Sequence, residues 1–223
     1  MVILRKYLTS SPLLVRTIPF IVFLLLTAIQ GQFGEQGKFW IYLAKCVVGF
    51  ILLYLTWSSV PEMRWRITPR AVGVGVLVCA LWVGLDSFYP KLGGVGAIHW
   101  NPFSTFGEGA NLAWFFFVIR VVGSSLIVPP LEEVFYRSFL YRYVANKDYS
   151  NVPLLGFRWM PFFVTSLLFG FAHSQWLPGI LCGLCFQWLV CRSGTLGESM
   201  VAHAITNFLL AIWILTKGAW TFW

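Results

Sequence analysis

Several ionisable and amide side chains of this sequence lie directly beside long apolar runs. Three short clusters of this kind occur: Glu132-Glu133-Val-Phe-Tyr-Arg137, Phe169-Gly-Phe-Ala-His173 and His203-Ala-Ile-Thr-Asn207. An ionisable group at bilayer depth is unfavourable by about 2.5–3.5 kcal/mol on insertion scales, so it requires a partner or a polar cavity. Three such clusters in one apolar chain therefore predict a buried polar site.

The spacing within the clusters indicates which side chains face the same way. Glu133 and Arg137 are four residues apart, so on a helix they share one face and can form an ion pair. Glu132 points about 100° away from that pair, and we expect it to face an aqueous pocket. His203 and Asn207 also share a face, where their N–H groups would suit an oxyanion. Taken singly, the first cluster is equally well explained as an ordinary ion pair at a helix start, and each histidine is better explained as a hydrogen-bonded core residue.

Composition indicates that the elements carrying these clusters are membrane helices. Of 223 residues, 58% are hydrophobic and only 11% are charged, whereas a soluble domain carries about 25% charged residues. A bilayer core requires about 20 apolar residues per helix. We therefore expect one all-α domain, residues 1–223, built as a polytopic bundle of seven or eight transmembrane helices. The predicted helices are 13–29, 39–60, 71–89, 110–128, 131–144, 159–173, 177–191 and 197–216.

The segment 131–144 differs from the other predicted helices because it mixes charged with aromatic residues. We expect a partly sunken amphipathic helix that begins after Pro129 and Pro130. Glu132 and Glu133 would then lie in its first turn, where free backbone N–H groups favour carboxylates.

The net charge of +8 predicts membrane orientation rather than nucleic-acid binding. The basic residues form no groove and collect in alternate connections, so no nucleic-acid partner is expected. The positive-inside rule then places the N-terminus in the cytoplasm, with its first apolar run kept as a helix. The residues that support this orientation are Arg5, Lys6, Arg16, Arg64, Arg66, Arg70, Arg137, Arg142, Lys147 and Arg158.

Two cations lie within predicted membrane helices. Lys45 is expected to extend its side chain to the membrane interface, as long basic side chains commonly do. Arg120 is nearer the middle of its helix, and it could reach either a cavity or a carboxylate.

Four further residues of chemical interest have ordinary explanations. Asp86, Glu198 and His99 fall near helix ends or in a loop, where we expect exposure to solvent. Trp100, like other tryptophans near helix ends, is expected to anchor the chain at the membrane interface.

The three motifs, taken in order, resemble one protein family. Glu-Glu-x-x-x-Arg, Phe-x-x-x-His and His-x-x-x-Asn on successive membrane helices resemble the CAAX protease and bacteriocin-processing family of intramembrane glutamate endopeptidases, which includes the type II CAAX prenyl proteases. The likeness covers about residues 128–207, which we expect to form the catalytic core. The compact length also resembles the bacterial CAAX prenyl protease-related subfamily linked to exosortase systems. A bacterial plasma-membrane protein is implied.

The resemblance implies roles for the residues of the three motifs. Glu132, assisted by His173, would activate a water for attack on a peptide carbonyl, while His203 and Asn207 would stabilise the oxyanion. The supporting residues would be Glu133, Arg137 and Phe169. The implied partner is a peptide or protein substrate in the membrane, cut near its C-terminus or membrane-proximal part, with lipidated or membrane-tethered substrates included. No cofactor is implied.

Two alternatives remain open at this point. Two histidines and a glutamate are a plausible zinc ligand set, although the spacing lacks a His-Glu-x-x-His pair and Asn207 suits a donor better than a ligand. A non-catalytic membrane partner or chaperone could also retain the fold and use its polar pocket for binding.

Overall fold

The computed structural model of the chain describes residues 2–92 and 100–223, and every regular element in those ranges is a helix. The all-α prediction is confirmed, while His99 lies outside the described residues. The helices are α1 (Val2–Leu8), α2 (Pro12–Ile29), α3 (Gly34–Thr56), α4 (Pro69–Gly84), α5 (Pro102–Phe106), α6 (Asn111–Val122), α7 (Val128–Glu133), α8 (Tyr141–Ala145), α9 (Trp159–Phe171), α10 (Trp176–Ser193) and α11 (Gly197–Lys217).

Three helical runs are long and apolar enough to cross a membrane. They are Pro12–Ser59, which contains α2 and α3, Asn111–Ala145, which contains α6 to α8, and Gly197–Lys217, which is α11. Helices α4 and α9 are shorter but also apolar. The chain is therefore a helical membrane protein.

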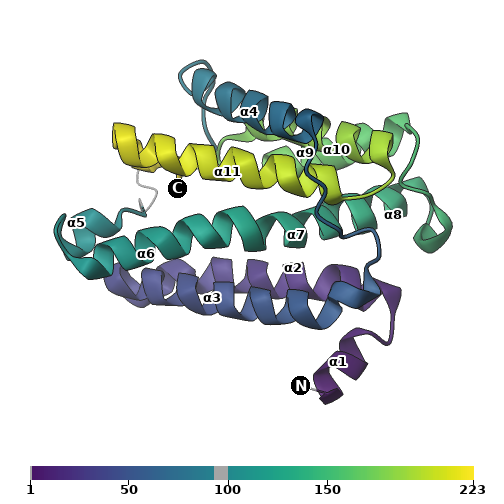
Figure 1. Cartoon of the computed structure of the whole chain (residues 1–223), viewed down its shortest axis with the longest axis horizontal. Coiled ribbons are helices and arrows are strands. Elements are labelled where there is room, and N and C mark those ends of the chain that lie inside the picture. Colours follow the sequence, from purple (N-terminus) through teal and green to yellow (C-terminus); the bar gives the residue numbers. More distant parts are fainter. Residues whose placement is uncertain (1, 93–99) are drawn as a thin grey trace.

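The helices pack side by side with their long axes roughly aligned (Figure 1). Helices α2 and α3 form an antiparallel pair along one side, and α4 packs with α11 on the other side, with the α6–α8 run between the two pairs. Helix α9 packs against α10. The α3–α4 and α8–α9 connections lie at the same end of the bundle as the start of α2 (Figure 1). The connections predicted to be cytoplasmic are thus gathered at one end.

Helix starts follow the local sequence. Ser11 accepts a hydrogen bond from the Leu13 N–H at the start of α2, and Thr68 accepts one from the Ala71 N–H at the start of α4. A proline follows each of these caps, at a position where its missing N–H would have no helical partner anyway. These caps explain why the first and third predicted helices begin within two residues of the observed ones.

Helices α6, α7 and α8 form one uninterrupted helical run of 35 residues, so the predicted break after Pro129 and Pro130 is wrong. Proline lacks an N–H, which leaves the carbonyls of the preceding turn without helical partners. A π-helical segment, Gly123–Ile127, comes just before the prolines, and across it the Val128 N–H donates to the Gly123 carbonyl. This wider turn shifts the hydrogen-bond register and lets the helix continue. Glu132 and Glu133 consequently lie inside a long helix rather than in a first turn.

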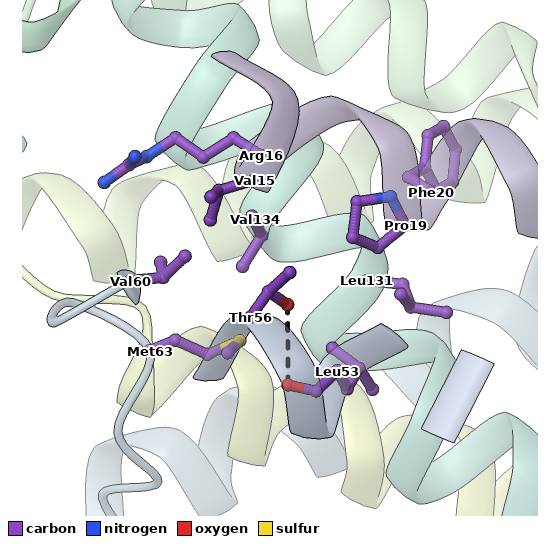
Figure 2. Close-up of a pocket in the computed structure, with 10 residues that line it drawn as sticks. All are labelled: Val15, Arg16, Pro19, Phe20, Leu53, Thr56, Val60, Met63, Leu131 and Val134. Atoms are coloured by element: carbon purple, nitrogen blue, oxygen red, sulfur yellow. Dashed lines mark hydrogen bonds between the residues drawn. The ribbon is translucent and has the colours of Figure 1, made fainter. Parts of the chain in front are cut away.

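One face of the α7 region is anchored against α2 and α3. Leu131 and Val134 line a small pocket of about 10 Å³ together with Val15 of α2 and Leu53 of α3 (Figure 2). This volume holds no more than about one water molecule. These residues are therefore closely packed, and the contact fixes the helix that carries Glu132 and Glu133 on its side facing α2 and α3.

Glycines allow close helix approach around the candidate site. A Cβ atom on Gly75 of α4 would lie 2.7 Å from the Ala202 carbonyl oxygen of α11. The Thr206 hydroxyl of α11 donates to the Gly75 carbonyl at 2.9 Å across the same contact. A Cβ on Gly170 of α9 would lie 2.6 Å from the Ile180 nitrogen of α10. Small residues of this kind let membrane helices pack backbone to backbone.

Glu198 is completely buried, so the prediction that it is solvent exposed is wrong. At the start of α11 its carboxylate accepts two hydrogen bonds from the Arg70 guanidinium of α4, both at 2.9 Å. This bidentate geometry is the strong form of an ion pair. It joins α4 to α11 and explains how a carboxylate tolerates burial there. Asp86 is half-buried and pairs with Lys91 at 2.9 Å.

A second polar network ties the N-terminal helices to the α6–α8 run. The Glu62 carboxylate, in the α3–α4 connection, binds the Arg16 guanidinium at 2.9 Å and also pairs with Arg142. The Ser138 hydroxyl donates to the same Glu62 oxygen and accepts a hydrogen bond from Arg16 Nε at 2.9 Å. Four side chains from three parts of the chain thus form one hydrogen-bonded, charge-paired network.

Candidate active site

A cavity of about 500 Å³ lies inside the bundle, and Glu132, His173, His203 and Asn207 all line it. These residues come from α7, from the turn after α9 and from α11. The walls between them are largely aromatic, and they include Phe20, Tyr136 and Phe169. The structure therefore brings the side chains of all three sequence motifs to one partly polar chamber.

The two adjacent glutamates face different surroundings, as their helical positions predict. Glu133 is fully buried, and its Oε2 lies 3.3 Å from Arg137 Nε, so the predicted ion pair is present. Glu132 lines the cavity, and its Oε2 is buried without a hydrogen-bond partner among the described residues. Glu133 is thus held by Arg137 and His203, whereas Glu132 lines the cavity and, among the described residues, has no ion-pair contact closer than 3.9 Å.

His203 lies between the two glutamates. Its Nδ1 is 3.1 Å from Glu133 Oε1, and its Nε2 is 3.9 Å from Glu132 Oε2. Because Glu133 pairs with Arg137 it is an ionised acceptor, so the proton in the first contact belongs to His203 Nδ1. This hydrogen bond orients the ring with Nε2 towards Glu132 and the cavity. The ring also packs against Phe186 of α10, with 5.1 Å between the ring centroids and the planes tilted by 32°.

One N–H of the Asn207 side-chain amide forms a hydrogen bond within the protein. Its Nδ2 donates to the Ser124 carbonyl at 2.8 Å. Ser124 lies in the π-helical segment Gly123–Ile127, where the altered register leaves carbonyls available. A side-chain amide has two N–H donors. The second donor can therefore serve a group in the cavity, and the hydrogen bond to Ser124 fixes the direction of the amide.

His173 lies just beyond the end of α9, which stops at Phe171 rather than at the predicted residue 173. Its Nδ1 is 2.8 Å from the Phe169 carbonyl oxygen. A carbonyl can only accept, so Nδ1 carries a proton, and in the neutral tautomer Nε2 is the acceptor. The Trp82 and Phe169 rings pack on the imidazole at centroid distances of 5.7 and 4.8 Å. These contacts hold His173 with a basic nitrogen free to bind a proton.

The Phe169 ring lies between the charged and imidazole groups of the site. The Arg137 guanidinium carbon lies 4.2 Å from the centroid of its ring, a distance at which the ring face attracts the cation. The same ring approaches His173 and, at 6.1 Å, His203. Phe169 therefore contributes an apolar wall and also stabilises the buried charge of Arg137.

Two cations outside the three sequence motifs also line the cavity. Lys45 is only 4% exposed and donates to the Thr27 hydroxyl at 3.0 Å, so the prediction that it extends to the membrane interface is wrong. Arg120 reaches the cavity, which was one of its two predicted positions. Trp100 is buried against Arg120 instead of anchoring an interface. Sequence position alone did not distinguish these outcomes, because it does not show which way a helix is turned within the bundle.

The donor set does not fit a zinc site. In residues 2–92 and 100–223, no three His, Cys, Asp or Glu side chains group closely enough to hold a metal ion.

Comparison with known proteins adds one finding. Residues 110–209 match the model of a family described as type II CAAX prenyl endopeptidase Rce1-like. The match begins at the start of α6 and includes Glu132, His173, His203 and Asn207. No curated protein and no solved structure matches the chain.

Proposed function

Since residues 110–209 belong to the Rce1-like type II CAAX prenyl endopeptidase family, we propose that the protein is an intramembrane glutamate endopeptidase that cuts near the C-terminus or membrane-proximal part of its substrate. The observation that carries the proposal is that Glu132 lines one cavity together with His173, His203 and Asn207, while the neighbouring Glu133 is held in an ion pair with Arg137. A base, a second imidazole and two N–H donors around one space are the groups that peptide hydrolysis requires.

In the proposed reaction Glu132 acts as the general base. A water bound between the Glu132 carboxylate and His173 Nε2 gives a proton to Glu132 as its oxygen attacks the peptide carbonyl carbon. The proton then passes from Glu132 to the leaving nitrogen as the carbon–nitrogen bond breaks. His173 supports this step because its Nδ1 proton is held by the Phe169 carbonyl, which leaves Nε2 to accept a hydrogen bond from the water.

The oxyanion of the tetrahedral intermediate would be held by α11. His203 and Asn207 both line the cavity and lie one helical turn apart on α11. For His203 to donate from Nε2 while Nδ1 donates to Glu133, the ring must carry both protons. The Glu133 carboxylate stabilises that doubly protonated ring. Glu133 and Arg137 therefore act as positioning residues.

The cavity walls favour an apolar substrate. Phe20, Phe23 and Leu24 of α2 line the side opposite α11. An extended peptide with apolar side chains, including one tethered to the membrane by a lipid, would bury those side chains against this wall. We accordingly propose a membrane-associated peptide or protein substrate in a bacterial plasma membrane, with the N-terminus of the enzyme in the cytoplasm.

Peptide cleavage by the purified protein tests the proposal. Wild-type protein in nanodiscs is incubated with a library of apolar C-terminal peptides, beside the Glu132→Ala and His173→Ala variants. We expect products from the wild type and a loss of about 10²-fold or more in each variant. Cleavage that both variants retain would exclude this site. Peptide binding without any cleavage by the wild type would instead support the non-catalytic partner. A reporter fused after Arg66 and found outside the cell would contradict the orientation.

A further inference from the structure

The cavity contains two cations that hydrolysis as proposed above does not use. Lys45 of α3 and Arg120 of α6 both line it. Neither side chain forms an ion pair with a carboxylate in the described part of the chain, although every other cation in the interior does, Arg16, Arg137 and Arg142 among them. The Glu132 carboxylate attracts the Lys45 ammonium only across the cavity. Two interior positive charges therefore lack a contact counterion.

Arg120 is enclosed by aromatic rings rather than by acceptors. Its guanidinium carbon lies 4.6 Å from the centroid of Tyr42, 5.1 Å from Trp100 and 5.5 Å from Trp223. Among the described residues, its Nε is buried without a hydrogen-bond partner, and the indole Nε1 of Trp100 beside it is too. Ring faces attract a cation but accept no strong hydrogen bond. The aromatic rings thus hold Arg120 in place, and its guanidinium keeps N–H donors for a ligand in the cavity.

Lys45 completes the same region of the wall. Its ammonium lies 4.8 Å from the Phe23 ring centroid and 4.7 Å from that of Tyr42, and one of its three N–H groups goes to Thr27. Tyr42 therefore lies between the two cations and in contact with both. An anionic group bound here would meet two positive charges at once.

We propose that Lys45 and Arg120 bind the C-terminal carboxylate of the substrate, which makes the enzyme selective for a free chain end. This inference rests on the proposed endopeptidase function. A peptide made of apolar residues carries one obligatory anion on its C-terminal side, its terminal carboxylate. Arg can bind a carboxylate with two parallel hydrogen bonds. A phospholipid phosphate has similar chemistry, but it would bring its glycerol and acyl chains into the 500 Å³ that the reacting peptide occupies.

The distance between the two parts of the cavity suits this arrangement. Arg120 precedes Glu132 by twelve residues on one uninterrupted helical run, which corresponds to about 18 Å at 1.5 Å per residue. Both side chains line the same cavity. An extended peptide at about 3.3 Å per residue covers a span of this length with about five residues. The subsite therefore places the scissile bond a short, defined number of residues before the free end.

A binding experiment tests the carboxylate subsite independently of cleavage. The Glu132→Gln protein, which keeps the cavity but lacks the base, is placed in phosphatidylcholine nanodiscs. A fluorescent apolar peptide is titrated in two forms, with a C-terminal carboxylate or a carboxamide. We expect the acid to bind roughly 10- to 100-fold tighter than the amide, the range of charge-assisted hydrogen bonds. With Arg120→Gln added, the peptide acid should bind only as tightly as the peptide amide, and binding of the amide should not change. With Arg120→Lys instead, part of the preference for the acid should remain.

Matched controls separate this role from a structural one. Lys217→Gln removes an exposed charge from the end of α11 and should leave the acid preference intact. Equal binding of acid and amide to the Glu132→Gln protein, or an Arg120→Gln effect that weakens both alike, would overturn the proposal. The titration is repeated in phosphatidic acid nanodiscs. If this lipid removes the preference for the acid peptide in the protein that has Arg120, the occupant is a lipid phosphate, and the proposal is overturned. An acid preference in binding, with no cleavage by the wild type, would refute the endopeptidase and leave the carboxylate subsite supported.

Discussion

The imidazole of His203 connects the buried ion pair to the cavity, because its Nδ1 lies 3.1 Å from Glu133 Oε1 while its Nε2 lies 3.9 Å from Glu132 Oε2. Glu133 in turn pairs with Arg137. One carboxylate thus fixes both a cation on its own helical run and a histidine on α11. The orientation of the proposed oxyanion donor depends on a residue that does not line the cavity.

We predict that Glu133→Gln impairs both stability and catalysis. Arg137 is 1% exposed, and leaving such a cation without its carboxylate destabilises a protein by about 3–5 kcal/mol. His203 would also lose the negative charge that stabilises its doubly protonated form, so kcat should fall by about 10²-fold. The measurements are the thermal midpoint in detergent and kcat per folded enzyme.

The double variant Glu133→Gln/Arg137→Met separates these two effects. It removes the unpaired cation, and it should recover most of the stability without recovering kcat. Recovery of both would mean that Glu133 acts only by neutralising Arg137, and that its contact with His203 is not needed for catalysis.

Glu132→Gln should abolish activity with little change in stability. Glu132 has no contact closer than 3.9 Å to a charged partner, and the amide has nearly the same shape. Loss of a general base lowers kcat by about 10²–10⁴-fold. The matched control is Glu198→Gln, which changes a buried glutamate outside the cavity. Because it breaks the pair with Arg70, it should lower the thermal midpoint and leave kcat per folded enzyme unchanged. The opposite pattern would exchange the assigned roles of the two glutamates.

Asn207→Asp should lower kcat with little effect on KM. The substitution replaces the N–H donors with a carboxylate that repels the oxyanion, and loss of one oxyanion donor lowers kcat by about 10²–10³-fold. It also removes the hydrogen bond to Ser124. Thr216→Val, near the exposed end of the same helix, serves as the control and should behave as wild type. A higher KM at unchanged kcat would place Asn207 in substrate binding instead.

The Glu62 network predicts that the folded protein loses stability at acid pH. Burial alone would raise the pKa of the Glu62 carboxyl, but Arg16, the hydrogen bond from Ser138 and Arg142 outweigh it and lower the pKa below its ordinary value of 4.5. A carboxyl whose folded-state pKa is lowered contributes stability that is fully present above the unfolded-state pKa and is lost as pH falls through the folded-state pKa. The thermal midpoint should therefore fall below about pH 4.5. Glu62→Gln should be less stable by about 3 kcal/mol at neutral pH and should show a flatter acid limb. An unchanged acid limb would assign the lability to other carboxylates.

Chelation tests the metal-free route of the proposal. Activity should survive exhaustive treatment with a chelator at the level of the untreated enzyme, because the base and the oxyanion donors are all side chains. Activity that disappears on chelation and returns with added zinc would overturn the glutamate mechanism. The Glu132→Gln variant, assayed with and without zinc, provides the background rate.

The sequence by itself determined membrane residence, the helical class and the local pairs within each helix. A scarcity of charge is a property of composition, and a spacing of four residues places two side chains on one face of any helix. For this reason the Glu133–Arg137 pair and the shared face of His203 and Asn207 could be predicted without a structure. The proximity of Phe169 and His173 has the same local origin.

Only the tertiary structure decided which faces of the helices contact one another. His203 lies 70 residues from Glu133 in the chain, and their contact depends on how α11 is rotated and translated against α7. Glu198 is buried because α4 brings Arg70 to it, and Lys45 faces inwards because α2 supplies Thr27. The helix also passes through Pro129 because a π-helical turn and its packing against α2 and α3 sustain it. Helical periodicity is local information, whereas the rotation of each helix in the bundle results from the packing of all its neighbours.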